Sequence, residues 1–534
     1  MNVDLAITNG RVLDGTGSPA QRGSVAIEGD RIVAVGPEAD RKARRTIDAE
    51  GMVVSPGFID MHTHSDLVPL VEPGCPAKVM QGVTTEVIGQ DGLSYAPLTD
   101  ETLPYFRTTL KALNGDPAGL DWDWRSVAEY LDRFDRCVAV NVAFLAPHGN
   151  LRAAVLGLED RAPSRSELDE MKRLLDRAMR EGAFGLSTGL TYAPCSFGDA
   201  HELTGLCEVV ARHGGYFAPH MRNYGAEMEA AVEEVIGIAT TAGVPLHLTH
   251  FHASFSTGKG KADLYLERIA AARRAGLDVT LDAYPYLAAS TFLAGLLPSW
   301  AHEGGPERLL RRLGDPEARS KIRHEMEVSG SDGLQKLPAQ WETIVVTDVE
   351  NERSAGLVGL SFAEIAGRLG KAPFDCFVDL LVEEKLAVSC LLFIGHEENL
   401  QKLVRDPALM AGSDGLLIGR RPHPRAWGTF ARYLARYTRE LGVLSLPECV
   451  RKMTSLPARR LGLPDRGTLR PGMMADLVVF DPDRVQDTAT YENPKSYPEG
   501  VPYVIVNGQV VKDAGQPTDA LPGRALRRVR ETHQ

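Results

Sequence analysis

Two histidines spaced two residues apart, His62 and His64, are the clearest sign of chemistry in this sequence. They end the segment GFIDMHTH (57–64), which follows an apolar stretch and indicates a short strand. Side chains at positions i and i+2 of a strand point to the same side, so both imidazoles can turn toward one point. A single histidine is usually satisfied by ordinary hydrogen bonds, but two on one face at the end of a strand fit a metal ion.

Other polar residues follow predicted strands farther along the chain. We expect strands that end near His62, Asp91, His148, Ser187, His220, His250, Tyr284 and Asp414. Amphipathic helices separate them, and Ser164 with Glu167 forms a capping box ahead of one such helix. Short apolar strands that alternate with helices are typical of a parallel α/β fold, and the eight strand-helix units predict a closed (β/α)8 barrel of the TIM type.

In such a barrel the carboxyl ends of the strands meet on one face, where active sites lie. We expect six residues to gather there: His62, His64, Asp91, His220, His250 and Asp414. Burying several imidazoles and carboxylates together is costly unless a cation or a proton satisfies them. Imidazole nitrogen and carboxylate oxygen suit zinc (Zn²⁺) first, with manganese (Mn²⁺), cobalt (Co²⁺) and iron (Fe²⁺) as alternatives.

A metal site of this kind predicts metal-assisted amide hydrolysis. The ion lowers the pKa of a bound water to about 7 and polarises a carbonyl group. Asp414, in the Ser-Asp-Gly turn at 413–415, is then expected to take the proton from that water and to deliver it to the leaving nitrogen.

The two ends of the chain differ from its middle in their pattern of apolar and polar residues. Residues 5–54 alternate apolar and polar with turn signals at Asn9-Gly10 and Gly29-Asp30, which predicts short antiparallel strands, and the same texture returns at 475–482 and 501–515. We therefore predict one small sheet domain built from 1–54 and 466–534 beside a barrel at 55–465. About 120 residues, from roughly 291 to 408, replace a short connection, and they predict a partly helical insertion over the barrel mouth.

Composition limits the classes of function. The chain has 534 residues, of which 43% are hydrophobic, and a net charge of −12, so an enzyme-sized core is expected and a surface for nucleic acid or anionic membrane is not. The seven cysteines are odd in number and contain no CxxC pair, which predicts reduced thiols. No apolar run reaches the roughly 20 residues of a membrane span and the N-terminus has no basic leader region, so the cytoplasm is the expected compartment. The sequence carries no signal for an oligomeric state.

Several motifs together resemble the N-acyl-D-amino-acid deacylases (D-aminoacylases) of the amidohydrolase superfamily. They are GFIDMHTH, LSTGLTYAP, PHMRNYG, LTHFHA, DAYPYLAAST and SDG…RPHPRAWGTF, and they span nearly the whole chain. The resemblance implies a (β/α)8 barrel with a composite β-sandwich. It also implies a small-molecule substrate, an N-acyl amino acid or related amide, that is cleaved to a carboxylic acid and a free D-amino acid.

The resemblance also assigns residues. It places metal ligands at His62, His64, His220 and His250, the general base at Asp414, a carboxylate-reading arginine at Arg425, and further substrate contacts at Tyr192, Tyr284 and Ser290. Two positions depart from the family pattern. Asp91, in GQDG, stands where the family commonly has a cysteine ligand, and a carboxylate can bridge two ions, so one or two metal ions are expected. His252 stands where the family tends to have a lysine, so it is expected to contact substrate or to add a ligand.

Three alternatives stay open at this point. Hydantoinase-like and dihydroorotase-like enzymes hydrolyse cyclic amides on the same scaffold, but they bridge two metals with a carboxylated lysine that AFGLSTGLTYAP lacks. A dipeptide hydrolase is a second alternative. A non-catalytic binding homologue is the third, and the complete set of histidines with Asp414 argues against it.

Overall fold

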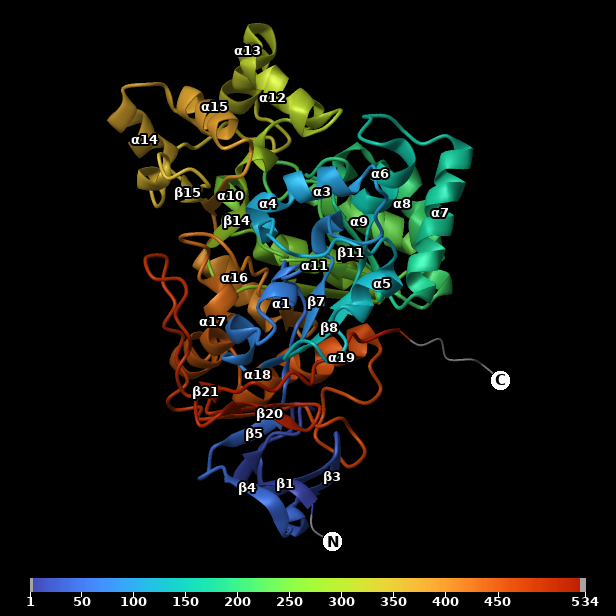
Figure 1. Cartoon of the computed structure of the whole chain (residues 1–534), viewed down its shortest axis with the longest axis vertical. Helices are drawn as coiled ribbons and strands as arrows, with labels where there is room; N and C mark the ends of the chain where they lie inside the picture. The colour runs from blue at the N-terminus through green and yellow to red at the C-terminus, as the bar shows by residue number, and fades with distance from the viewer. Residues whose placement is uncertain (1–2, 529–534) are drawn as a thin grey trace.

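Strands from both ends of the chain form one nine-stranded sheet in the computed structural model, which describes residues 3–528 (Figure 1). Its order is β21-β20-β19-β18-β5-β1-β2-β3, with β4 paired to β1. The strands are β1 (Val3–Val12), β2 (Gln21–Glu28), β3 (Arg31–Gly36), β4 (Ala43–Asp48), β5 (Val53–Pro56), β18 (Leu477–Phe480), β19 (Tyr503–Val506), β20 (Gln509–Asp513) and β21 (Gln516–Pro517). Antiparallel pairing of β18 with β5 joins the two arms.

The N-terminal arm is not antiparallel throughout, and that part of the prediction was wrong. Strands β4 and β5 both run parallel to β1, whereas β1 with β2 and β2 with β3 are antiparallel. The turn signals specify only hairpins between neighbouring strands. Strands β4 and β5 return to β1 through longer connections, which local turn residues do not encode.

Parallel strands occupy the middle of the chain in two sheets. One has the order β6-β7-β8 and the other β17-β13-β12-β11-β10-β9. Their bounds are β6 (Phe58–Asp60), β7 (Val83–Ile88), β8 (Asn141–Phe144), β9 (Ala146–Pro147), β10 (Gly185–Gly189), β11 (Tyr216–His220), β12 (Leu246–Leu248), β13 (Val279–Ala283) and β17 (Leu409–Ala411). Only Leu145 separates β8 from β9. Every predicted strand of the middle is therefore present, and each ends within a few residues of its predicted end.

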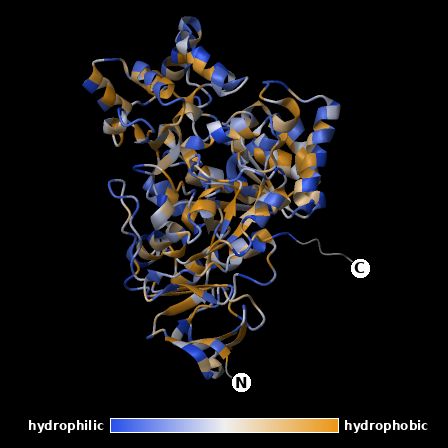
Figure 2. Cartoon of the chain, in the orientation of Figure 1, coloured by the Kyte–Doolittle hydropathy of each residue, from blue (hydrophilic) through white to orange (hydrophobic). Residues whose placement is uncertain are grey.

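Helices follow most of these strands and cover them. They include α6 (His148–Leu156), α7 (Arg165–Arg180), α8 (Ala200–Arg212), α9 (Met228–Ala242) and α11 (Ala262–Arg274). The predicted capping box forms at α7, where the Ser164 side chain accepts a hydrogen bond from the backbone N–H of Glu167. Helix α8 packs between α7 and α9 (Figure 1). Figure 2 shows that the central strands are mostly hydrophobic and that the helices carry both hydrophobic and hydrophilic residues. This mixture is expected because one face of each helix meets the core and the other meets water.

The insertion contains a small sheet as well as helices. The antiparallel order β14-β16-β15 joins β14 (Ala288–Phe292), β15 (Ile344–Asp348) and β16 (Ser389–Phe393). The helices are α12 (Pro306–Gly314), α13 (Pro316–His324), α14 (Phe362–Leu369), α15 (Pro373–Glu383) and α16 (Glu397–Arg405), and α12 to α15 project from one end of the molecule (Figure 1). The helical pieces match the prediction. The sheet was not predicted, because its strands are short and pair over long distances in sequence.

Shorter helices complete the chain. They are α1 (Val68–Val71), α2 (Pro76–Val79), α3 (Leu103–Thr109), α4 (Lys111–Asn114), α5 (Val127–Asp132), α10 (Phe255–Gly258), α17 (Arg425–Arg432), α18 (Leu446–Met453) and α19 (Ser455–Leu461). All seven cysteines are free, and only Cys137 is exposed. Between residues 3 and 528, no helix has both the length and the apolar character to cross a membrane.

Candidate active site

Asp91 lies between two pairs of histidines at the carboxyl ends of the parallel strands. Its Oδ1 atom is 3.7 Å from Nε2 of His62 and 3.5 Å from Nε2 of His250. Its Oδ2 atom is 3.5 Å from Nε2 of His64 and 3.5 Å from Nδ1 of His220. One carboxylate therefore reaches all four imidazoles.

Two groups of potential metal ligands share Asp91. The first consists of His62, His64, Asp91 and Asp414, and the second of Asp91, His220 and His250; within each group the ligand atoms lie within 4.8 Å of one another. All six side chains are buried. Both ring nitrogens of His62 and Oδ1 of Asp91 have no hydrogen-bond partner among the described residues. Because unpartnered buried nitrogen and oxygen atoms are costly, this donor set fits one or two divalent cations.

Left-handed backbone conformations place three of these side chains. The angle φ is 53° at Asp91, 32° at His250 and 49° at Asp414. Residues other than glycine rarely adopt such angles, and those that do cluster at functional sites, where the surrounding structure holds them.

The loop that carries Asp91 is held by the neighbouring strand β10. The Oγ atom of Ser187 donates to the backbone oxygen of Gly89 at 2.5 Å and accepts from the backbone N–H of Gly92 at 3.1 Å. A Cβ atom at Gly189 would lie 2.3 Å from the backbone oxygen of Asp91. The close approach of loop and strand therefore requires glycine at position 189.

Asp282 of β13 contacts three histidines, two of which, His62 and His250, belong to the ligand groups. Its Oδ1 accepts from the backbone N–H of His250 at 2.8 Å, and its Oδ2 is 3.6 Å from Nδ1 of His62 and 2.9 Å from Nε2 of His247. Burial favours the neutral acid, but His62 and His247 hold the pKa of Asp282 below its usual range. A carboxylate beside Nδ1 of His62 favours a proton there, which leaves the lone pair of Nε2 directed at Asp91. The sequence prediction missed Asp282, although it begins the DAYPYLAAST motif.

A buried lysine links the ends of β6 and β17. The Nζ atom of Lys78 donates to Oδ2 of Asp60 and to Oγ1 of Thr63, both at 2.7 Å. Asp60 in turn accepts from the backbone N–H and the hydroxyl of Ser413, at 2.8 and 2.6 Å. This network fixes the strand that carries His62 relative to the turn that carries Asp414. Neither Lys78 nor Asp60 was predicted, although Asp60 lies inside GFIDMHTH.

The electrostatics of the site suit a bound cation. Burial raises the pKa of Asp91, but His250, His62 and His220 outweigh it and hold the pKa well below its usual range. Burial lowers the pKa of His64, but its contacts with Asp414 and Asp91 raise it to about 10, so a bound cation has to displace a proton from this imidazole. The carboxylates are therefore ionised at neutral pH, and they concentrate negative charge where the imidazoles converge.

Arg425 lies directly behind the predicted base. Its Nη1 atom is 2.9 Å from Oδ2 of Asp414, its Nη2 donates to the backbone oxygen of Ser290 at 3.2 Å, and its guanidinium lies 4.4 Å from the ring centroid of Tyr284. Burial raises the pKa of Asp414, but Arg425 holds it below its usual range. The Nε atom of Arg425 has no partner within residues 3–528.

A cleft opens onto these residues. The predicted substrate-contacting residues Tyr192, His252, Tyr284 and Ser290 all line it, while Arg425 touches its wall from behind. His252 packs on Tyr284 with ring centroids 4.4 Å apart, and burial lowers its pKa to about 3. It does not join either ligand group. The segment 291–408 supplies Leu296, Leu334 and Ile394 to the lining, among other residues.

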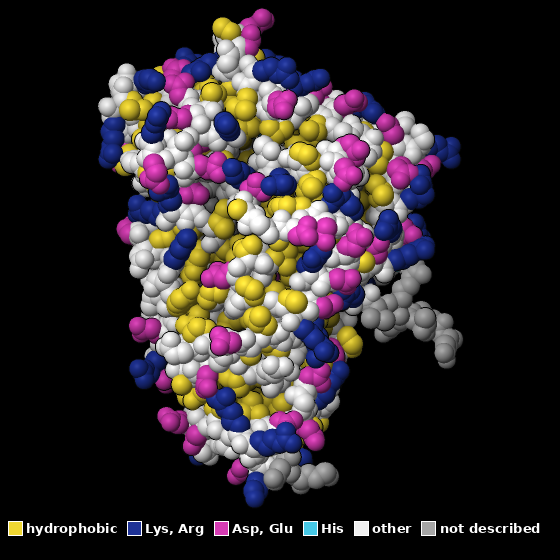
Figure 3. All heavy atoms as spheres, in the orientation of Figure 1, with side chains coloured by type: hydrophobic (Ala, Val, Ile, Leu, Met, Phe, Trp, Pro, Cys, Tyr) yellow, Lys and Arg dark blue, Asp and Glu magenta, His cyan; other side chains and the backbone are white. Residues whose placement is uncertain are grey.

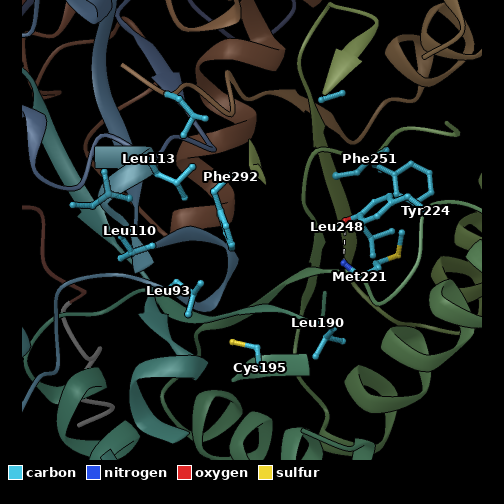
Figure 4. Packing of buried hydrophobic residues seen from close by; sticks show 14 of the residues in the cluster. Leu93, Leu110, Leu113, Leu190, Cys195, Met221, Tyr224, Leu248, Phe251 and Phe292 are labelled. Carbon is cyan, nitrogen blue, oxygen red and sulfur yellow. Dashed lines mark hydrogen bonds between the residues drawn. The ribbon is translucent and has the colours of Figure 1, made fainter. Parts of the chain in front are cut away.

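Three residues of the cleft lining were not predicted: Thr191 and Tyr224, which contact His220, and Gln335, which contacts Tyr224. Thr191 Oγ1 lies 2.8 Å from Nε2 of His220, and the Tyr224 ring packs against the same imidazole. Gln335, from the insertion, accepts from the backbone N–H of Tyr224 through Oε1 at 2.7 Å. Figure 4 shows Tyr224 beside Met221, whose backbone N–H donates to the tyrosine hydroxyl. Thr191 and Tyr224 lie in the motifs LSTGLTYAP and PHMRNYG, whereas no motif marks Gln335.

Comparison with known proteins agrees with this arrangement. The model of the Amidohydrolase family matches residues 45–512. The chain belongs to the amidohydrolase family. This amidohydrolase is 37% identical over 528 residues to the N-acyl-D-glutamate deacylase of Alcaligenes xylosoxydans xylosoxydans, covering 98% of this chain and 97% of the relative. The predicted resemblance is confirmed.

Solved structures give the same result. One is the N-acyl-D-glutamate deacylase of Bordetella bronchiseptica, complexed with zinc and a phosphonate mimic of the tetrahedral intermediate. It has a TM-score of 0.84 to this amidohydrolase at 34% identity, covering 99% of this chain and 100% of that one. A second solved structure is a D-aminoacylase with a binuclear metal centre, in which one metal activates the enzyme and the second attenuates it. Its TM-score to this amidohydrolase is 0.83 at 35% identity, covering 98% of this chain and 100% of that one. A D-hydantoinase reaches only 0.55 at 16% identity, which shows a shared fold alone.

Proposed function

We propose that this amidohydrolase is a metal-dependent deacylase that hydrolyses the amide bond of N-acyl-D-amino acids to a carboxylic acid and a free D-amino acid. The observation that carries the proposal is the position of Asp91 within reach of His62, His64, His220 and His250, with Asp414 beside them, at the floor of a cleft. Full-length similarity to deacylases of N-acyl-D-amino acids supports the reaction class.

We infer that zinc is the cofactor, held by His62, His64, His220, His250 and the shared carboxylate of Asp91. When bound, the metal supplies positive charge that polarises a carbonyl oxygen and acidifies water. Support comes from the unpartnered nitrogens of His62 and from the zinc in a structure 34% identical to this chain. Asp91 in place of a thiolate makes the donor set harder, so manganese, cobalt and iron(II) remain alternatives.

Asp414 has the position of a general base and acid. It is ionised and faces the same point as His62 and His64, so it can accept a proton from water and return it to the leaving nitrogen. Arg425 pairs with Asp414 on one side, donates to the backbone oxygen of Ser290 and packs against the ring of Tyr284, both of which line the cleft. We assign it to the substrate carboxylate, because a planar guanidinium pairs with a carboxylate through two hydrogen bonds. Tyr192 and His252 complete the proposed substrate contacts.

Release of free amine from matched enantiomers tests the proposal. Zinc-loaded protein is mixed with N-acetyl-D-leucine, N-acetyl-L-leucine, a hydantoin and a dipeptide. Amine release from the D-acyl compound alone is the expected result. Ring opening of the hydantoin without deacylation would favour the cyclic-amide alternative, cleavage of the dipeptide would favour the peptidase alternative, and binding without any turnover would favour a non-catalytic homologue.

We also propose the finer fold that the sequence predicts. The two parallel sheets would form one closed (β/α)8 barrel at 55–465. In support, the N–H of Met61 donates to the oxygen of Ala411 at 3.3 Å, and that of Phe184 donates to the oxygen of Phe144 at 2.8 Å, which bridges both gaps between the sheets. The nine-stranded sheet of 1–54 and 466–534 would fold as a β-sandwich, because side chains of β1, β2, β18 and β19 share one apolar cluster.

A soluble cytoplasmic enzyme with small-molecule partners completes the proposal. Figure 3 shows basic and acidic side chains interspersed over the visible face, which does not favour binding of nucleic acid or anionic membrane. The free cysteines suit a reducing compartment.

A further inference from the structure

The walls of the cleft are strongly apolar away from the metal-ligand groups. Leu93, Leu110, Leu113 and Phe292 all line it, and Figure 4 shows these four on one side of the view and Tyr224, which also lines the cleft, on the other. Leu296 and Ile394 of the insertion extend this surface. Uncharged polar side chains such as Asn114 and Gln335 also line the cleft.

Positive charge is scarce in the cleft. Among its lining residues, all within 3–528, none is a lysine or an arginine, and the acidic ones are Asp91 and Asp414. The guanidinium of Arg425 is the cation that lies against this wall, and Asp414 already engages one of its nitrogens at 2.9 Å. Under the proposed function, this cation is assigned to the substrate carboxylate. A second carboxylate would find no lysine or arginine among the lining residues.

We infer that this deacylase takes N-acyl-D-amino acids with apolar side chains and rejects those with an acidic side chain, such as the glutamate and aspartate derivatives. The inference rests on the proposed function and adds the class of side chain to it. An apolar side chain leaves water for a leucine-lined surface, which is favourable. An acidic side chain loses its hydration there without gaining a lysine or arginine to pair with, which is costly.

A panel of three substrates separates charge from size. The values of kcat/KM are measured on zinc-loaded protein with N-acetyl-D-leucine, N-acetyl-D-glutamine and N-acetyl-D-glutamate. Glutamine has the shape of glutamate without its charge, so it is the matched control. Leucine should exceed glutamate by about 100-fold or more, as expected when a charged group is left unpaired, with glutamine between them. Glutamate within tenfold of leucine, or glutamine as poor as glutamate, would overturn the inference.

A binding measurement keeps this test separate from that of the proposed function. Calorimetry compares phosphonate analogues of the leucine and glutamate substrates on the same zinc-loaded protein. If no substrate is deacylated, the proposed function fails, yet tighter binding of the leucine analogue would still support an apolar site. Equal or tighter binding of the glutamate analogue would overturn the inference whether or not turnover occurs.

Discussion

The guanidinium of Arg425 and the carboxylate of Asp414 form a buried ion pair, with Nη1 2.9 Å from Oδ2. The pair joins the proposed carboxylate-binding group to the proposed base. It keeps Asp414 ionised, because the positive charge opposes the effect of burial on its pKa. In the proposed function, where Arg425 binds the substrate carboxylate and Asp414 is the base, this one contact couples substrate binding to proton transfer.

Replacing Arg425 by methionine should weaken both steps. Without the cation the pKa of Asp414 rises, so the acid limb of the kcat/KM profile should move to higher pH. Activity at neutral pH should fall by about 100-fold or more, the usual effect of removing one partner of a buried charged pair. Arg432→Met is a matched control on the same helix, since Arg432 pairs with Asp487 at 2.9 Å outside the cleft. An acid limb that stays in place in Arg425→Met would contradict the coupling.

Asp414→Asn should abolish turnover and leave the fold intact. A carboxamide cannot accept the proton, and loss of a general base typically lowers kcat by about 10² to 10⁴-fold. Circular dichroism and thermal unfolding check the fold, and Asp406→Asn, outside the cleft, serves as the control. Unchanged activity in Asp414→Asn would remove this residue from the base role.

Asp91→Cys should shift metal preference toward zinc. A thiolate is a softer ligand than a carboxylate, so the ratio of zinc to manganese affinity should rise, whereas Asp91→Ala should weaken binding of both metals. Competition calorimetry measures the ratio, with the exposed Asp100→Cys as the control for a new thiol. If the ratio in Asp91→Cys equals that of the wild type, Asp91 is not a ligand.

Glu86 should make the folded state less stable as pH rises. Burial raises its pKa from 4.5 to about 7, although Lys78 and Ser65 act in the opposite direction. The folded state therefore binds more protons than the unfolded state between these values, so this contribution is full below pH 4.5 and is lost by about pH 7. The loss amounts to about 3 kcal/mol in the free energy of unfolding.

Glu86→Gln tests this pH dependence by removing the titrating group. Urea unfolding across the same pH range should show a flatter stability profile for the variant than for the wild type. The exposed Glu233→Gln should follow the wild type. Parallel profiles for wild type and Glu86→Gln would show that the carboxyl group does not titrate in this range.

The residues of the two ligand groups could be predicted from the sequence, because their spacing within a strand and their places at the ends of predicted strands mark them. The spacing of His62 and His64 puts both on one face of a strand, and His220, His250 and Asp414 follow recognisable strands whose carboxyl ends converge. Asp91 was found by the same rule.

The supporting residues could not be found in this way. Lys78 and Asp282 are ordinary charged residues by sequence, and only tertiary contacts with Asp60 and His62 give them a place in the site. Gln335 reaches the cleft through a long insertion whose path local patterns do not define. The small sheet of β14, β15 and β16 was missed for the same reason, because its pairing depends on contacts far apart in the chain.

The metal content of the purified protein, measured together with its activity, tests the central claim most directly. The protein should contain one or two equivalents of zinc or a related divalent ion. Chelation should abolish amine release from N-acetyl-D-leucine, and added zinc should restore it. Full deacylase activity in protein that contains no metal would contradict the assignment of His62, His64, Asp91, His220 and His250.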